Sequence, residues 1–550
     1  MLFREIWRLL GYFFFGFALT LLVPLGVAIY YDYWIPTALH PQPATTGVFA
    51  VCFIICLLIA ATFRTLGSKA QGHLYLREAL ASVAFIWLFT PMIGGLPFYL
   101  SNTLKNPLHC YFESISGFTT TGATTMIAKA YDSETGAEIP RQKVIPGVYS
   151  TKYIYYGTID PVRDPETGTI IAEGVEAVSK PLLFWRSFQQ WLGGMGIIVL
   201  FVAILPALGI GGKMLLHAEM PGPIKDSLTP RIKETAAHFW KIYVGLTILQ
   251  IAILQFTNPA IDWFDASTIS FSTLSTGGFS TRNMSIGSFA NVHTDWVVIA
   301  FMVLGSLNFT LYFHAFRGKI YRIYEPEFLV YILILFCTCS FATLYLTGTP
   351  NILLNGVYAG DYTVSEAVRY GTFQLISAQT STGFVTTDYD WWPYPTQTLM
   401  LIVMYLGGMS GSTAGGMKII RPYMLFRILQ TRVESMFRPN AVRTFKIGHH
   451  EIDSGVALTV LCFFLTLISF AVLGSFLYII DGIDPETAIS LVTCMINNIG
   501  IAFRMDGPTE SCAFLSNFSI LTSCLWMVLG RLEFFAILVI LVPAFWKENV

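Results

Sequence analysis

Four short loops that combine polar side chains with a glycine recur between the long apolar stretches of this 550-residue chain. They read Thr120-Thr121-Gly122, Ser275-Thr276-Gly277, Ser381-Thr382-Gly383 and Asn498-Ile499-Gly500. Glycine permits backbone conformations that other residues avoid, so carbonyl oxygens beside it can turn inward and replace the water around a cation. The loops therefore predict a pore assembled from four parts of one polypeptide. The expected ion ligands are the residues before the glycines: Thr120, Thr121, Ser275, Thr276, Ser381, Thr382, Asn498 and Ile499.

The alternative interpretation is four ordinary turns between helices, because Thr-Gly pairs are common in turns. The matched register of the loops and the similar lengths of the segments before them favour the pore. The four motifs contain no acidic residue. Carbonyl ligands suit a large monovalent ion that dehydrates readily, whereas calcium or magnesium would call for carboxylates. Potassium is therefore the expected ion, and no organic cofactor is expected on this chain.

The composition places the chain in a lipid bilayer. Hydrophobic residues make up 54% and charged residues 12% of the sequence, and the mean hydropathy is +0.60. A soluble domain carries about 25% charged residues, so this chain has half the usual charge. The net charge of −1 indicates no nucleic-acid partner. The nine cysteines are scattered, so neither a zinc site nor a disulfide framework is expected.

A membrane-spanning helix needs about 20 mostly apolar residues. Ten stretches are candidates: 10–31, 47–65, 78–99, 182–207, 236–257, 294–316, 327–348, 397–420, 455–480 and 517–545. The first two form a leading hairpin, and the other eight form four pairs that each enclose one loop. We therefore expect an all-α polytopic membrane protein with four helix–pore-loop–helix repeats arranged pseudo-fourfold around a central pore. The expected units are the hairpin 1–70 and the repeats 71–212, 213–325, 326–450 and 451–550.

A short helix is expected before each loop. Asn106-Pro107 and Asp484-Pro485 place a capping side chain before a proline, Thr363 and Glu366 fit a capping box, and Asp262 or Asp265 can cap the remaining helix. Ten to twelve helical residues would span roughly 15–18 Å, about half of a hydrocarbon core. Such a helix can enter the membrane and return but cannot cross it. Its partly negative C-terminal end would favour a cation at the centre.

Basic residues predict the orientation. Six of them lie between Arg421 and Lys446, whereas the connections beside the second, third and fourth loops hold only Arg282, Arg369 and Arg504. Both termini are therefore expected in the cytoplasm. Residues 127–180 are polar and interrupt the first repeat. We expect a tolerated extracytoplasmic surface insertion, with a short hairpin at Val148–Tyr156 or Thr169–Val175.

The eighth apolar stretch contains five glycines within the ten residues Gly407–Gly416. Each glycine costs a helix about 1 kcal/mol, so we expect a broken helix with a flexible gate loop beneath the filter, although close helix packing is the alternative. Arg531 lies near the middle of the last span, where we expect it to face the pore; local pairing with Glu533 is the alternative. Glu113 is expected to satisfy buried polar groups. The gate residues are expected to be Gly407, Gly408, Ser410, Gly411, Ser412, Thr413, Gly415, Gly416 and Arg531.

Several stretches resemble the Trk/Ktr superfamily of potassium transporters, and its TrkH/TrkG branch in particular. They are Ser116–Thr124, Ser275–Thr281, Gln190–Gly196 and Ala218–Pro223. The resemblance implies potassium uptake through a central pore, a homodimer in the inner membrane of a bacterium, and a cytoplasmic nucleotide-binding (NAD or ATP) regulatory ring. It also implies that Gly407–Gly416 is the gate and that Arg531 is the basic residue of the last helix. The size of the insertion 127–180 and the presence of Arg504 after the last loop depart from the family pattern.

Two other functions are the alternatives to a gated pore. A sodium- or proton-coupled potassium symporter, or a less selective potassium and sodium carrier, would use the same broken helices. A polytopic enzyme would need a nucleophile with its base, or a metal cluster, inside the spans. The sequence has no His-x-x-Glu-His or Gly-x-Ser-x-Gly motif, so a transporter is expected and an enzyme is not.

Overall fold

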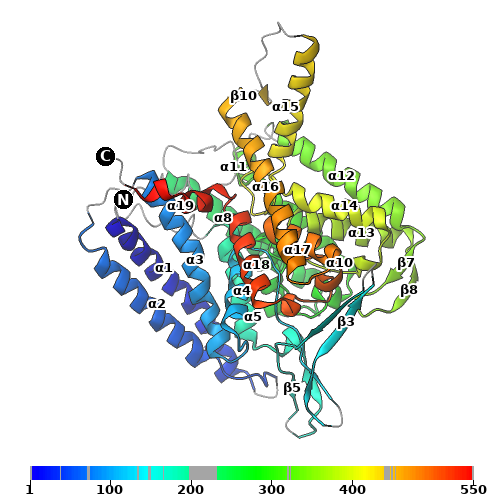
Figure 1. Cartoon of the computed structure of the whole chain (residues 1–550). Coiled ribbons are helices and arrows are strands. Elements are labelled where there is room, and N and C mark those ends of the chain that lie inside the picture. Colours follow the sequence, from blue (N-terminus) through cyan, green and yellow to red (C-terminus); the bar gives the residue numbers. More distant parts are fainter. Residues whose placement is uncertain are drawn as a thin grey trace.

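The computed structural model describes residues 3–36, 39–70, 75–132, 135–146, 150–164, 166–196, 232–318, 321, 324–438, 446–447, 450–451 and 454–547. Helices dominate it (Figure 1). Among the described residues, six helices are long and apolar enough to cross a membrane. Their bounds are α1 Phe3–Ile29, extended by Tyr30–Trp34, α2 Thr46–Leu66, α3 Leu76–Leu100, α8 Ile232–Thr257, α12 Pro326–Leu346 and α16 Ser454–Ile480.

Two further candidates are sharply bent. The helices α10 (Val292–Ser306) and α11 (Phe309–Phe316) meet at 93°, and α18 (Asn517–Arg531) and α19 (Phe535–Leu541) meet at 118°. If each bent pair is one span, the described residues contain up to eight spans. The expected total of ten is therefore not confirmed.

The two remaining stretches are not continuous helices in the described residues. In the stretch 182–207, α5 (Lys180–Gly194) is described, and residues 197–231 lie outside the described part. In the stretch 397–420, α14 (Tyr394–Leu406) ends before the glycines, and α15 (Ile420–Phe437) begins after them. The expected helix interruption is confirmed, because residues 407–419 are not helical.

The four short helices begin where their capping residues predict. They are α4 Pro107–Phe118, α9 Trp263–Leu274, α13 Val364–Gln379 and α17 Pro485–Asn497. The side chains of Asn106, Asp262, Thr363 and Asp484 accept hydrogen bonds from backbone N–H groups of the first turn. These side chains satisfy donors that no helical carbonyl can reach. Each helix ends one or two residues before its loop.

The all-α expectation is incomplete, because the described residues also form five two-stranded antiparallel sheets. The insertion contains three: β1 Ala130–Tyr131 with β2 Glu138–Ile139, β3 Arg141–Ile145 with β4 Thr151–Tyr155, and β5 Val162–Arg163 with β6 Ile170–Ala172. Both expected hairpin ranges hold only the second strand of a pair. The other sheets pair β7 Pro350–Ile352 with β8 Tyr358–Asp361, and β9 Lys446–Ile447 with β10 His450–Glu451.

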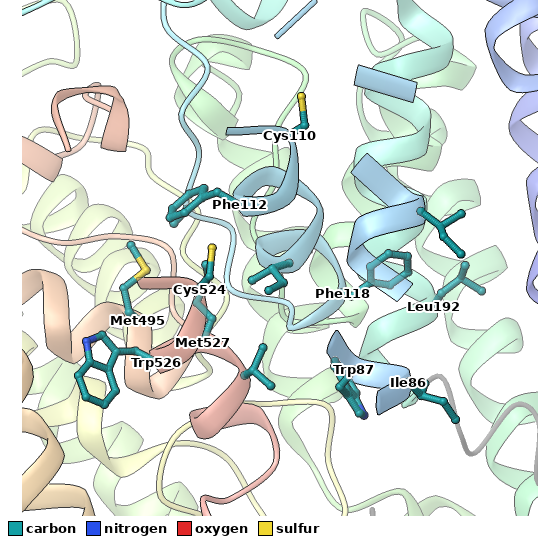
Figure 2. Close-up of a cluster of buried hydrophobic side chains, with 14 of the residues drawn as sticks. Ile86, Trp87, Cys110, Phe112, Phe118, Leu192, Met495, Cys524, Trp526 and Met527 are labelled. Carbon is teal, nitrogen blue, oxygen red and sulfur yellow. The ribbon is translucent and has the colours of Figure 1, made fainter. Parts of the chain in front are cut away.

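The largest buried cluster joins the first and last repeats. Figure 2 shows Phe112 and Phe118 of α4 in one cluster with Trp87 of α3 and with Met527 and Trp526 of α18. All five side chains are at most 3% exposed. Burying aromatic side chains of this size is a major source of stability, so this core positions the first loop between distant parts of the chain.

Candidate functional site

The four loops share an uncommon backbone conformation. We call the three residues of each loop a triad. The first residue of each triad, its opening residue, has positive φ although it is not glycine, and the third, its closing residue, is a glycine with positive φ. The opening residues are Thr120 (φ +56°), Thr276 (+53°), Ser381 (+54°) and Asn498 (+54°). The closing residues are Gly122 (+85°), Gly278 (+76°), Gly383 (+82°) and Gly500 (+87°). Because positive φ is strained for residues with a Cβ atom, its recurrence at matched positions marks four equivalent turns.

This geometry corrects the sequence alignment of the second loop by one residue. The equivalent triad is Thr276-Gly277-Gly278, and Ser275 is the C-cap of α9. The N–H of Gly277 donates to the carbonyl five residues earlier, as does the N–H of Thr121. Gly277 is therefore the middle residue, and Gly278 is the counterpart of Gly122. Because Gly277 and Gly278 are adjacent, the sequence does not show which of them corresponds to Gly122. The positive φ of Gly278 identifies it as the counterpart.

The triads form a closed ring, which we call the loop ring: Thr120–Gly122, Thr276–Gly278, Ser381–Gly383 and Asn498–Gly500. Each closing glycine lies against the middle carbonyl of the next triad, and the fourth glycine returns to the first triad. A Cβ atom added to these glycines would lie 2.2 Å from Gly277 O (Gly122), 1.9 Å from Thr382 O (Gly278), 1.9 Å from Ile499 O (Gly383) and 2.2 Å from Thr121 O (Gly500). Only glycine permits such close approach.

Hydroxyl groups hold the first and third triads. Ser116 Oγ donates to Ala123 O at 2.6 Å, and Ser377 Oγ donates to Phe384 O at 2.8 Å. The hydroxyls of Thr119 and Thr121 lie 2.8 Å apart. The equivalent pair in the third repeat, Thr380 and Thr382, lies 2.7 Å apart. These hydroxyl groups therefore tie the first and third triads to the ends of their own short helices.

Amide side chains hold the second and fourth triads. Gln190 Nε2 donates to Gly277 O at 2.5 Å, and Gln190 Oε1 accepts from Phe279 N at 3.0 Å. Asn498 Nδ2 donates to both Thr121 Oγ1 and Met527 O at 2.9 Å. Sequence reasoning missed the role of Gln190, although a glutamine in an apolar stretch is itself a signal of a buried polar contact.

A buried ion pair lies within the first repeat, behind the loop ring, and its arginine also reaches the second repeat. Glu113 Oε1 lies 2.6 Å from Arg186 Nε, and both side chains are at most 2% exposed. Glu113 also accepts from the hydroxyl of Thr124 at 3.0 Å, which confirms that it satisfies buried polar groups. Arg186 Nη1 donates to Ser280 O at 3.1 Å, after the second triad. Arg186 was not predicted, although an arginine within an apolar stretch usually has a buried partner.

Cavities lie on both sides of the loop ring. A cavity of about 220 Å³ is lined by all four closing glycines and by residues of the insertion and of the segment 506–511. Burial raises the pKa of the Asp506 carboxyl in its lining to about 7, so this group changes protonation near neutral pH. A smaller cavity of about 100 Å³ is lined by Gly411, Gly415, Lys418 and Arg531, among others.

The non-helical residues 407–419, which we call the glycine segment, lie against the loop ring. Thr413 Oγ1 donates to Leu274 O and Gly305 O, both at 2.9 Å. The N–H of Gly415 donates to Ser381 Oγ at 2.6 Å. A Cβ atom on Gly415 would lie 2.3 Å from Asn497 O. The segment therefore contacts the ends of the short helices in the second, third and fourth repeats.

The other glycines and serines predicted for the gate also lie in the glycine segment. Gly407, Gly411 and Gly416 have φ of +64°, +70° and +68°. Gly416 packs against Gly407 Cα, and Gly408 packs against Ser306. Ser412 Oγ donates to Met409 O at 2.6 Å, whereas the backbone N–H of Ser410 donates to Glu327 Oε1 at 2.6 Å. Lys418, which sequence reasoning missed, is buried and donates to Ala414 O at 2.7 Å.

Arg531 connects the glycine segment to the loop ring. Its Nη1 donates to Thr413 O at 2.9 Å and to Thr120 Oγ1 at 3.0 Å. Its Nη2 donates to Gly193 O at 2.6 Å and to Gly194 O at 3.1 Å. Glu533, the partner considered from sequence, forms an ion pair with Arg421. Arg504 lies in the segment after the fourth triad and pairs with Glu486 at 2.7 Å.

Comparisons with known proteins point to one family. A family model described as TrkH, a cation transport protein, matches residues 164–548. The chain is 31% identical to the Trk system potassium uptake protein TrkH of Escherichia coli (strain K12) over the full length of both. It is 27% identical to TrkG of the same organism over 99% of each chain. The crystal structure of the potassium transporter TrkH from Vibrio parahaemolyticus matches all of both chains, with a TM-score of 0.77 at 30% identity.

Proposed function

This chain belongs to the TrkH family of cation transport proteins, and we propose that it takes up potassium across the cytoplasmic membrane of a bacterium. The names of its relatives support potassium as the ion. The observation that carries the proposal is the closed ring of middle carbonyls and closing glycines. A ring of carbonyl oxygens can replace the hydration shell of a potassium ion.

In this proposal the ion is coordinated by two layers of the loop ring. Carbonyl groups of the opening residues form one layer, and those of the middle residues form the other. The proposed ligands are Thr120, Thr276, Ser381 and Asn498 in the first layer, and Thr121, Gly277, Thr382 and Ile499 in the second. The C-terminal ends of the four short helices add partial negative charge at the same centre. The closing glycines are required because a side chain there would collide with the neighbouring triad.

The glycine segment is proposed as the gate. It lies against the loop ring, and Arg531 holds it through Thr413 O. Opening would require the segment to leave the ends of the short helices, which glycine-rich backbone can do at low steric cost. The Trk system of the relatives supports partner subunits for this chain. We propose a homodimer whose gate is opened by a cytoplasmic ring that binds NAD or ATP.

Growth of a potassium-uptake-deficient bacterium at low external potassium tests this function. The parent chain should restore growth, whereas Gly122→Ser and Gly383→Ser should each raise the potassium requirement about tenfold or more, since a Cβ atom would displace a ring carbonyl. Gly482→Ser is the matched control, because Gly482 also has positive φ (+90°) but has no atom within 4 Å of an added Cβ. Failure of the parent to restore growth, or full growth with both ring variants, would contradict the assignment.

Potassium uptake into proteoliposomes separates a gated pore from coupled symport. Uptake through a pore should persist when external sodium is removed and when the proton gradient is collapsed at a fixed membrane potential. A strict requirement for either gradient would instead support the symporter.

A further inference from the structure

The β3–β4 hairpin of the insertion contacts the fourth repeat, which lies more than 300 residues away in sequence. Lys143 Nζ donates to Arg504 O at 3.0 Å and to Glu510 Oε1 at 2.8 Å. Figure 1 shows β3 running alongside the outer loops near α17. Arg504 follows Gly500 by four residues and has a strained φ of +63°. The lysine therefore holds a carbonyl in the strained backbone just after the fourth triad.

A second contact reaches the start of the same repeat. Tyr153 OH donates to Asp484 Oδ1 at 2.7 Å and accepts from Asp484 N at 2.8 Å. Asp484 caps α17, and its other carboxyl oxygen accepts from Thr487 N at 3.0 Å. Both Tyr153 and Asp484 are buried. The hairpin therefore holds the N-cap residue of the short helix whose last turn leads into Asn498.

Apolar packing supports these polar contacts. Tyr153, Tyr155 and Ile145 form one buried cluster with Met505 of the fourth repeat. The Tyr153 ring lies 5.5 Å from the ring of Phe514. Strand β4 alternates buried and exposed residues, so one face packs against the fourth repeat while Lys152 and Ile154 face outward. Tyr156, directly after the strand, is also exposed.

The fourth triad lacks the internal tethers of the first and third. Cys494 and Ile499 occupy the positions of Ser116 and Thr121, as judged by the shared hydrogen bond from the middle residue to the carbonyl five residues earlier. Neither hydroxyl bond of the first triad can form there. Asn498 anchors the fourth triad through its side-chain amide. The segment after Gly500 is bonded to α17, through Phe503 N and Ser490 Oγ at 3.2 Å, and also to residues outside the fourth repeat such as Lys143.

We propose that the β3–β4 hairpin is a positioning element for the fourth triad, and that Lys143 and Tyr153 set the ion selectivity of the loop ring by holding the segment from Asp484 to Glu510. This inference rests on the proposed potassium uptake. A hairpin that is only a tolerated insertion would add stability without altering selectivity. Loosening one triad of the ring lets its carbonyls close around a smaller ion, so sodium should compete better.

The test uses the full chain in proteoliposomes and measures rubidium uptake in competition with potassium and sodium. The double variant Lys143→Met/Tyr153→Phe removes four hydrogen bonds to the segment from Asp484 to Glu510. It should lower the preference for potassium over sodium about three- to tenfold, because only part of the lost free energy bears on selectivity. Tyr153→Phe alone keeps the buried ring and should lower it less. The matched controls are Lys152→Met, on the exposed face of β4, and Tyr156→Phe, at the exposed residue directly after it. Both should retain the parental preference.

Hydrogen–deuterium exchange provides a second measurement that does not depend on transport. Amides of residues 498–506 should exchange faster in the double variant than in the parent or the controls, and Lys143→Arg should keep slow exchange. Unchanged exchange, or unchanged selectivity in a folded and active double variant, would overturn the positioning role. A parent without potassium uptake would refute the proposed function instead, and exchange at 498–506 would then decide the role of the hairpin.

Discussion

At the residue scale, the second triad shows how one position decides the geometry of the ring. Gly278 has φ of +76°, and an added Cβ would lie 1.9 Å from Thr382 O. Gly277 occupies the middle position, where the other triads carry Thr121, Thr382 and Ile499. A Cβ atom on Gly277 would meet the Gln190 side chain, 2.5 Å from its Cδ, rather than backbone. A side chain can shift to relieve such a contact more easily than a ring carbonyl can.

We therefore expect Gly278→Ala to be more damaging than Gly277→Ala. The left-handed conformation alone costs alanine about 1–2 kcal/mol, before any collision with Thr382 O is counted. The potassium concentration that supports half-maximal growth measures the difference. Equal sensitivity of the two positions, or greater sensitivity at Gly277, would contradict the register assigned to the second triad.

At the element scale, the glycine segment interrupts what would otherwise be a spanning helix between α14 and α15. The freed backbone is satisfied by other elements: Met409 N donates to Ser306 O at 3.0 Å, and Gly415 N donates to Ser381 Oγ. Non-helical backbone at membrane depth is stable only when protein or a wet cavity satisfies it. These contacts explain how a non-helical segment is stable within the membrane. Moving the segment away would cost free energy unless its backbone groups found other hydrogen-bond partners.

Weakening the contacts of the glycine segment should favour the open state. Deleting Gly411–Gly415 should raise ion flux in proteoliposomes severalfold. Thr413→Val should raise it less, because it keeps the side-chain shape but removes the donations to Leu274 O and Gly305 O. Ser412→Ala is the control, since Ser412 Oγ bonds within its own turn to Met409 O. Unchanged flux in the deletion variant would count against a gating role.

At the scale of the whole molecule, the two ends of the described chain lie together. The rings of Phe3 and Trp546 stack with centroids 6.1 Å apart, and Arg77 Nη1 donates to Lys547 O at 3.2 Å. Figure 1 shows the insertion hairpins β3 and β5 at the opposite end of the molecule from α15. Because α15 belongs to the segment richest in basic residues, the proposed orientation places it and both ends in the cytoplasm.

Cysteine labelling tests this orientation in a chain whose exposed Cys337 and Cys462 are replaced by serine. Lys152→Cys, on the insertion, should react with a membrane-impermeant maleimide in intact spheroplasts. Arg432→Cys, on α15, should react only after the membrane is permeabilised. Both side chains are exposed, so access differs only by side of the membrane. The reverse labelling pattern would show that the orientation is inverted.

The sequence by itself determined the features that depend on near neighbours. Capping residues such as Asn106 and Asp484 act on N–H groups two or three residues away, so the starts of the short helices could be predicted. The interruption at Gly407 likewise follows from local glycine content. The presence of four similar loops was also readable, because each motif is a few residues long.

Only the tertiary structure decided how these parts meet. Three features depend on residues more than 100 positions apart. They are the contact of Gly278 with Thr382 O, the bond from Arg531 to Thr413 O, and the bond from Tyr153 to Asp484. No local rule selects among the many polar partners available to a long side chain. Burial selects them, because each enclosed donor or carbonyl needs a partner within about 3 Å, and only the packed fold brings one there.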